Sequence, residues 1–429
     1  MKTVLVFLLL GIGASAAEDS NRALTESLEE RAANAKAALM TTDQRIEFYR
    51  SLAAAHPGRQ RYKILLAATF LQKMRETTDF GYVDRSSRIL DEVLAADPSN
   101  YTALSLRAQV ALEYHQFSKA AEIARRLLAA QPRDPLNWGA LADALTEMGD
   151  YDAAGDAIQK MVDLRPDLAS YNRAAHFRFL NGDAAGAIDI MRRAIESGAS
   201  SPENVAWCSV ELGDMFFKTG RMEEARAAYA RAIQSFPGSH KAWASLGRLQ
   251  AATHDYATAA ASYLRAQSMV PMPDYAAALY DIYTAMGDKT RAAKERDTFD
   301  LIDRLAIANN ETANRNLALI LSDHNWNPAR GLKLAQAELN VRRDVYTYDA
   351  LAWALYRNGD FAGAEQAIAK AVKLKTPEPQ FYMHSALIAQ ALGKTQVAAA
   401  AMERASALNP LWPGVSDCHL INSKTAALE

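Results

Sequence analysis

The sequence contains little cysteine, no long apolar run and no excess of charge of either sign. Cys208 and Cys418 are the only cysteines in 429 residues, which excludes a fold held together by a set of disulfides. Lys and Arg number 48 against 50 Asp and Glu, so the formal net charge is -2. This balance gives no reason to expect nucleic acid, whose binding depends on many basic contacts to phosphate. No run is long and apolar enough to span a bilayer, so we expect no membrane-spanning segment in the mature chain.

Motifs that carry chemistry are also missing. The sequence has no His-x-x-x-His, no cysteine pair at metal-binding spacing and no Gly-x-Ser-x-Gly, so it predicts no metal, no cofactor and no catalytic residue. Gly393-Lys394-Thr395 matches the end of a phosphate-binding loop, but Ile388 stands where that loop needs its first glycine. We therefore predict that the protein is not an enzyme.

The first residues have the form of a secretory signal peptide. Lys2 is followed by an apolar run from Val4 to Ile12 and then by small residues around Ala16, after which acidic residues begin. A membrane anchor is the alternative, but the run is too short to cross a bilayer. We expect residues 1–17 to be cleaved and the protein to be periplasmic or secreted. The alanine-rich sequence favours a bacterial source.

Proline recurs at a fixed interval along the chain. Intervals of 34 residues separate Pro98 from Pro132, Pro132 from Pro166 and Pro237 from Pro271, and 33 residues separate Pro377 from Pro410. A period of this length indicates a helix–turn–helix repeat.

The residues between the prolines repeat as well. One unit reads Trp243-x-x-Leu246-Gly247, then Ala259-x-x-x-Tyr263, then Pro271. Related patterns begin at Trp138, Leu212, Tyr348 and Tyr382. This resembles the tetratricopeptide repeat family over about residues 44–412. The resemblance implies an all-α fold, a right-handed α-solenoid of about ten helix–turn–helix repeats, with units starting near 60, 101, 135, 168, 206, 240, 273, 311, 345 and 379.

Local signals agree with helical hairpins. Glycine occupies the turn inside many units, where its freedom to adopt positive φ ends a helix. Asp134-Pro135 and Ser201-Pro202 place a capping side chain before a proline at the start of a helix, and Thr41 with Gln44 forms a capping box. No unit can bury its apolar faces alone, so stacking must supply the core.

We divide the chain into a signal peptide at 1–17, N-terminal capping helices at 18–57, a first stack at 58–296, an irregular region at 297–344, C-terminal repeats at 345–412 and a tail at 413–429. Extra residues at 75–82 predict a longer loop inside the first unit. A second helix running from Asp288 to about Ala308, and a turn from Asp323 to Pro328 that replaces the usual glycine turn, indicate two stacks that meet at an angle.

The resemblance implies that the first helices of successive units line a concave groove that holds a partner segment. The candidate partner-binding residues on their polar faces are Asn172, Arg173, His176, Arg248, Arg315, Asn316, Tyr346, Asp349, Trp353, Arg357 and His384. Glu211, Asp214 and Asp281 belong to the same faces. The Lys and Asn clamp of the family's chaperone-tail binders is missing, so that ligand is not carried over.

Four of these candidates lie on one helical face. Tyr346, Asp349, Trp353 and Arg357 combine aromatic and arginine side chains, the composition of binding hot spots. The alternative is that Trp353 only packs against the neighbouring helix. For Arg173 and Arg315 the alternative is a solvated face.

Three functions follow from these observations. The favoured one is a non-catalytic scaffold that binds a protein or peptide in the concave groove, within an envelope or secreted assembly. The second is a solenoid that binds a glycan or another non-protein ligand through an aromatic, acidic groove. The third is an enzyme with its site at 288–327, which would require converging histidine and carboxylate side chains there.

Overall fold

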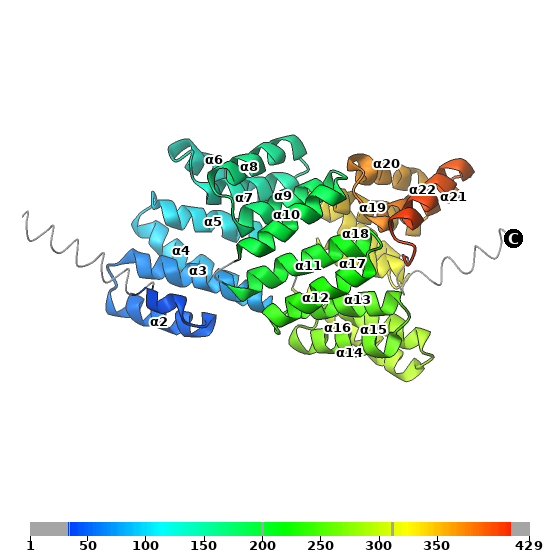
Figure 1. Cartoon of the computed structure of the whole chain (residues 1–429), viewed down its shortest axis with the longest axis horizontal. Helices are drawn as coiled ribbons and strands as arrows, with labels where there is room; N and C mark the ends of the chain where they lie inside the picture. The colour runs from blue at the N-terminus through cyan, green and yellow to red at the C-terminus, as the bar shows by residue number, and fades with distance from the viewer. Residues whose placement is uncertain (1–32, 34, 199–200, 310–312, 413–429) are drawn as a thin grey trace, which may run out of the picture.

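The computed structural model describes residues 33, 35–198, 201–309 and 313–412. The predicted signal peptide at 1–17 and Cys418 lie outside these residues. Regular structure in the described part is helical, without a strand, and the helices from α3 onward form ten consecutive antiparallel pairs (Figure 1). The prediction of an all-α solenoid is confirmed.

The helices begin and end as follows: α2 Thr42–Ala55, α3 Gln60–Thr77, α4 Gly81–Ala96, α5 Tyr101–Glu113, α6 Phe117–Ala130, α7 Pro135–Glu147, α8 Tyr151–Leu164, α9 Leu168–Leu180, α10 Ala184–Ser197, α11 Pro202–Lys218, α12 Met222–Ser235, α13 His240–Ala252, α14 Tyr256–Met269, α15 Pro273–Ala285, α16 Lys289–Ala308, α17 Arg315–Asp323, α18 Pro328–Glu338, α19 Val345–Arg357, α20 Phe361–Ala371, a 3₁₀ turn Val372–Leu374, α21 Pro379–Ala391 and α22 Thr395–Leu408.

The helix starts follow the capping signals in the sequence with one exception. Thr41 and Gln44 form the expected capping box, and Asp134 accepts the N–H of Leu136 beside Pro135 in the first turn. Ser201 makes no capping hydrogen bond. Its hydroxyl instead accepts a hydrogen bond from the Gln72 amide, 2.9 Å away, on a helix 129 residues earlier. The assignment of Ser201 as a cap was therefore wrong, because a contact between distant repeats uses its side chain.

The expected longer loop at 75–82 is also wrong. Helix α3 continues to Thr77 and α4 starts at Gly81, so the extra residues lengthen both helices. The longer α3 brings the next residue to a later repeat, where the Thr78 hydroxyl lies 2.8 Å from Nε2 of His240 at the start of α13. The chain thus meets itself across several repeats.

The irregular region has the expected long helix, α16, followed by the short helices α17 and α18. Asn325 adopts positive φ in place of the usual glycine. Phe299 of α16, Leu317 of α17 and Leu334 of α18 belong to one buried cluster, so the core continues through this region.

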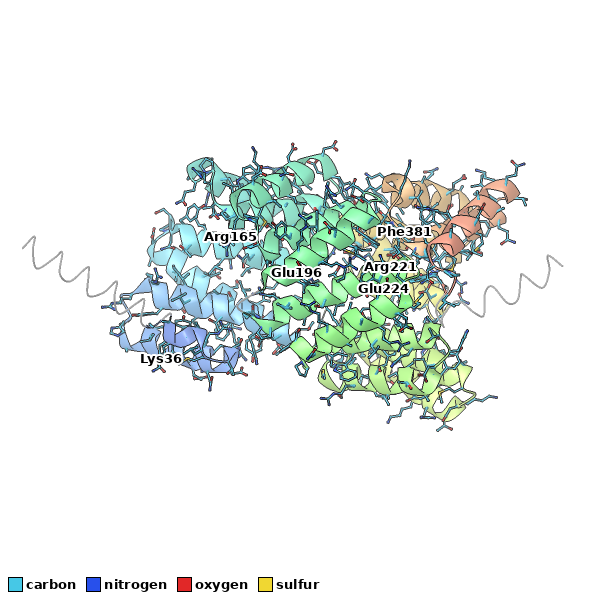
Figure 2. All side chains as sticks on the ribbon, viewed as in Figure 1. Lys36, Arg165, Glu196, Arg221, Glu224 and Phe381 are labelled. Atoms are coloured by element: carbon cyan, nitrogen blue, oxygen red, sulfur yellow. The ribbon has the colours of Figure 1, made fainter. Side chains whose placement is uncertain are left out.

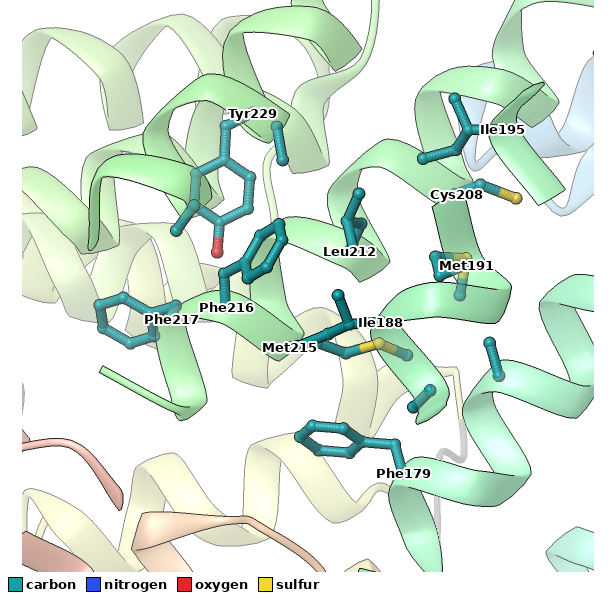
Figure 3. Close-up of a cluster of buried hydrophobic side chains, with 14 of the residues drawn as sticks. Phe179, Ile188, Met191, Ile195, Cys208, Leu212, Met215, Phe216, Phe217 and Tyr229 are labelled. Carbon is teal, nitrogen blue, oxygen red and sulfur yellow. The ribbon is translucent and has the colours of Figure 1, made fainter. Parts of the chain in front are cut away.

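The apolar faces of neighbouring pairs interlock to make the core. Figure 3 shows one such cluster, in which Phe179, Met191, Leu212 and Tyr229 meet between α9 and α12. A Cβ atom at Gly247 would lie 2.7 Å from the Tyr263 ring, so only glycine lets that ring lie against the facing helix. Each large apolar side chain buried in this way contributes about 1.5–3 kcal/mol.

The array curls until its C-terminal repeats touch the ends of earlier first helices (Figure 1). The Arg343 N–H donates to the Glu147 carbonyl at 2.8 Å, the Thr376 hydroxyl to the Leu180 carbonyl at 2.6 Å, and the Asn409 amide to the Phe217 carbonyl at 2.8 Å. The last two pairs are separated by 196 and 192 residues. We call this set of contacts the closure. It brings the C-terminal repeats against the first helices of earlier repeats.

The outer face is polar. Figure 2 shows Arg221 and Glu224 together at the start of α12, where they form an exposed ion pair at 2.7 Å. Such pairs contribute little to stability and mainly keep the surface soluble. Among the described residues, no helix is both long enough and apolar enough to cross a membrane.

Candidate partner-binding cavity

The inner faces of four consecutive first helices, α11, α13, α15 and α17, line a cavity of about 600 Å³. Gln380 at the start of α21 and Trp412 after α22 complete its wall, because the closure brings the last repeat back against α11. The Trp412 ring packs against Phe217, with ring centroids 5.7 Å apart. The last repeat therefore contributes to the cavity wall only because the array closes on itself.

Two ion pairs in the cavity wall hold neighbouring first helices together. Arg248 of α13 contacts Asp214 of α11 at 2.6 Å, and the Tyr229 hydroxyl donates to the same carboxylate. His324 contacts Asp281 of α15 at 3.0 Å. Burial alone would lower the pKa of His324, but its hydrogen bond to Asp281 and the nearby carboxylates raise it to about 9. His324 is consequently protonated at neutral pH and neutralises Asp281.

Other acidic groups in the cavity lack such a partner. Within the described residues the Glu211 carboxylate makes no hydrogen bond or ion pair, and burial together with the neighbouring Asp214 raises its pKa to about 7. Asp274, in the first turn of α15, is open to the cavity but enclosed by the concave face, and this enclosure raises its pKa to about 6. Both carboxyl groups thus sit where an added positive charge would favour ionisation.

Aromatic side chains alternate with these charges. Trp207 of α11 is 38% exposed, and the Lys241 ammonium lies 4.1 Å from its ring centroid. Enclosure lowers the pKa of Lys241 despite the acidic groups around it. Tyr263 and Tyr275 also belong to the wall, where both rings are buried. The surface can hold an elongated group that is apolar along its length and polar at its end.

His240 and Cys208, in and near the cavity wall, have structural roles. Burial lowers the pKa of His240 to about 4, and its ring lies between the hydroxyls of Tyr275 and Thr78 at 2.7 and 2.8 Å. Cys208 is buried in α11, and burial raises its pKa to about 12, so it is an unreactive thiol. No group of three or more His, Cys, Asp and Glu side chains in the described ranges could hold a metal ion.

Of the sequence candidates, Arg248 and Asn316 line the cavity, as do Glu211, Asp214 and Asp281. Arg248 is paired with Asp214, whereas Asn316 is exposed. Whether these residues contact a partner remains a prediction.

A second group of candidates lies at repeat contacts and the closure. Arg173 makes a two-pronged ion pair with Asp143 of the preceding repeat, at 2.7 and 2.6 Å. Arg315 contacts Asp344 at 2.8 Å. The ring of Tyr346 lies under the Lys218 ammonium at 5.5 Å. The solvated face considered for Arg173 and Arg315 does not describe them, because both are tied to neighbouring repeats.

Two more candidates adjoin these groups. His176 is half-buried, and burial with the nearby Lys218 charge lowers its pKa to about 4, which leaves it neutral. Asn172 is half-buried on the same helix, α9.

The aromatic face predicted on α19 is buried. Trp353 is 0% exposed, stacks on His384 with ring centroids 4.1 Å apart, and donates its indole N–H to Asp323. Asp349 is buried too and lies 2.9 Å from Nδ1 of His384. Arg357 covers the Trp353 ring at 5.7 Å. Asp349, Trp353 and His384 therefore cannot form an open contact face, and the packing alternative describes Trp353.

Sequence reasoning missed several cavity residues, namely Trp207, Lys241, Asp274, Asp323 and Trp412. A usable signal was present for the first three, which occupy equivalent positions in consecutive repeats, 34 and 33 residues apart. Residues at one repeat offset lie side by side on the concave face. Trp412 carries no such signal, since it reaches the cavity only through the closure.

Comparison with known proteins identifies the repeat. A family model described as tetratricopeptide repeat matches residues 79–135, 115–169, 139–202, 210–285 and 350–413, together more than half of the chain. Comparison with curated protein sequences gives no match.

Several solved structures are similar in part. PilW, described as a widely conserved type IV pilus biogenesis factor, is 17% identical, with 47% of this chain and 93% of that chain covered and a TM-score of 0.43. Pseudomonas aeruginosa pilF is 14% identical, with 46% and 88% covered and a TM-score of 0.41. YrrB, described as having an unusual peptide-binding site, is 16% identical, with 42% and 91% covered and a TM-score of 0.32.

Proposed function

Because the chain belongs to the tetratricopeptide repeat family, we propose that it is a non-catalytic scaffold that holds a segment of a partner polypeptide in the cavity. One observation carries the proposal: four consecutive concave faces converge on one cavity that contains the exposed Trp207 ring and carboxyl groups without an ion pair among the described residues. Clefts of a few hundred Å³ with an apolar lining and a few polar groups are the usual form of binding sites.

An enzyme at 288–327 finds no support. His324 is ion-paired to Asp281 and stacks on Trp326, with ring centroids 4.2 Å apart, and Trp326 packs on Phe299 at 4.6 Å. This is a packed turn whose histidine is used for structure. The tetratricopeptide repeat architecture therefore favours binding as the role.

A glycan ligand is the weaker candidate. Sugars bind to open aromatic faces, but the Tyr346–Trp353 surface that favoured a glycan is largely buried. The exposed indole of Trp207 already carries the Lys241 ammonium on its ring face. A polypeptide segment suits the mixture of rings, paired charges and free carboxylates better.

We also propose that the scaffold works outside the cytoplasm, in an envelope or secreted assembly. The support is the sequence of residues 1–17 with its short apolar run and small residues before the acidic stretch. Mass spectrometry of the mature N-terminus tests this point, and an intact Met1 would count against it.

Site-specific photocrosslinking tests the scaffold proposal. A photoreactive residue at Ser245, which lines the cavity, should give a covalent adduct with a polypeptide in an extract of the native host. The matched control is Ala261, exposed on the outer helix α14. Adducts at Ser245 that excess unlabelled protein suppresses, and that are missing at Ala261, support the proposal. No adduct at Ser245, or equal labelling at both positions, would refute it.

A further inference from the structure

The chemistry of the cavity specifies its occupant more narrowly. Resting on the proposed function, we infer that the bound segment carries a lysine or arginine side chain whose cationic end lies against Glu211 and Asp274. The inference rests on charge balance, on the shape of the lining and on hydrogen-bonding groups left over by the fold.

The charge balance of the lining is acidic once the internal pairs are removed. Five carboxylates line the cavity: Glu211, Asp214, Asp274, Asp281 and Asp323. Asp214 is neutralised by Arg248 and Asp281 by His324. Asp323 accepts the Trp353 indole N–H and interacts with His324 and His384. This leaves Glu211 and Asp274 facing one cation without an ion pair in the described residues, Lys241, because His240 is neutral. A ligand with one positive charge would complete the balance.

Lys241 does not form an ion pair with these carboxylates. Its ammonium rests on the Trp207 ring, and no carboxylate in the described part of the chain is within ion-pair distance of it. Glu211 of α11, Lys241 of α13 and Asp274 of α15 line the same cavity on consecutive first helices, and the Lys241 charge favours ionisation of both carboxyl groups. A cationic ligand in this cavity would add a second positive charge that favours ionisation of both.

The groups that face Glu211 make its ionisation sensitive to such a ligand. Asp214 on its own helix opposes the charged form, whereas Lys218, Lys241 and Arg248 favour it, and burial outweighs them. A bound ammonium or guanidinium would stabilise the charged form further. Binding should therefore release protons near neutral pH.

The remaining lining suits the rest of such a segment. The exposed part of the Trp207 ring provides apolar surface for the methylene stem of lysine or arginine, whereas the Tyr263 and Tyr275 rings are buried in the wall. The indole N–H of Trp412 is buried in the wall and has no acceptor among the described residues, and a small turn of the ring would offer it to a backbone carbonyl of the ligand. An extended basic peptide meets all three requirements.

The chain's own C-terminal residues fit less well. Residues 413–429 carry Asp417 and Glu429 against Lys424, which is the wrong sign for this cavity. Their competition is nevertheless measurable and forms one arm of the test.

The test uses short fluorescein-labelled peptides of Ala, Leu, Gly and Ser with a central pair of Lys, Arg, Gln or Glu, measured by fluorescence anisotropy with the full chain. The Lys and Arg peptides should bind about tenfold or more tightly than the Gln peptide, and the Glu peptide weakest. The double variant Glu211→Gln with Asp274→Asn should lose that preference. The control, Asp189→Asn with Glu196→Gln on exposed α10, removes the same charge and should keep it.

Three results would overturn the inference. The first is that the Gln or Glu peptide binds as tightly as the Lys and Arg peptides. The second is that no peptide binds. The third is that the double variant keeps the preference for basic peptides, as the control does. A peptide of residues 413–429 that displaced the basic peptides, together with tighter binding by a chain ending at Trp412, would assign the cavity to the chain itself and also overturn it. The first three outcomes leave the Ser245 crosslink to a partner unchanged, so scaffold and ligand chemistry are judged separately, whereas occupation by residues 413–429 would remove that crosslink as well.

Discussion

Gly149 offers a direct measurement of whether the closure forms in solution. It has φ +76, and a Cβ atom there would lie 2.5 Å from the Arg343 carbonyl oxygen in the facing repeat. Gly287 occupies the same turn of another repeat with φ +74, and a Cβ atom there would meet nothing within 4 Å. Alanine at either position therefore has the same backbone strain, but only Gly149→Ala also places its Cβ atom against the Arg343 carbonyl of the closure.

The two variants should differ by a predictable amount. Left-handed backbone costs an L-residue about 1–2 kcal/mol, which is the whole expected effect of Gly287→Ala. Gly149→Ala adds an overpacking cost of about 1–3 kcal/mol. Separation of the two backbones would also weaken the Arg343 N–H bond to Glu147, worth about 1 kcal/mol. We expect Gly149→Ala to lose about 3–6 kcal/mol in total.

Urea unfolding followed by circular dichroism gives the stability loss, and small-angle X-ray scattering gives the shape. Gly149→Ala should unfold at lower urea than Gly287→Ala and have a larger radius of gyration. Equal unfolding midpoints and identical scattering curves for the two variants would mean that the repeats around Gly149 and Arg343 do not touch, and this part of the closure would be refuted.

Two further predictions concern buried groups. The folded state raises the pKa of Glu211 from 4.5 to about 7, so it holds an extra proton between these values and its stability falls as pH rises through that window. At about 1.4 kcal/mol per pKa unit, Glu211→Gln should stabilise the protein by up to about 3 kcal/mol at pH 8 and by nothing near pH 4. Thermal unfolding across this range checks it, and a gain independent of pH would contradict the cause. Trp353→Ala should cost about 3–5 kcal/mol by leaving a cavity beside His384. Hydrogen exchange should then show lost protection in α17–α22 but unchanged protection in α3–α6, and uniform loss would contradict nearest-neighbour stacking.

The repeat structure could be predicted because its determinants are local. Proline intervals and glycine turns depend on the φ preferences of single residues, and a unit of fixed length repeats them many times. The predicted starts at 60, 101, 135, 168, 240, 273, 345 and 379 coincide with helix starts, and those at 206 and 311 are four residues away. The capping box at Thr41 needed only four residues of sequence.

The candidate site was predicted less well because contacts between distant repeats decide it. Trp353 and Arg248 follow the same helical period, yet one is buried by α21 and the other lines the cavity. Trp412 and Ser201 depend on where the chain returns after more than a hundred residues. That return is set by the summed twist of many repeats, and small errors per repeat accumulate. Period and composition contain no such information.

Solenoids usually tolerate the gain or loss of a unit, since each hairpin touches only the next. Here the carbonyl at Leu180 must meet Thr376, and that at Phe217 must meet Asn409. One hairpin more or fewer between the two members of each pair would move Thr376 and Asn409 away from their acceptor carbonyls. The number of hairpins in this interval should therefore be the same in all relatives that keep the closure. Hairpins added before α3 would leave these contacts unchanged.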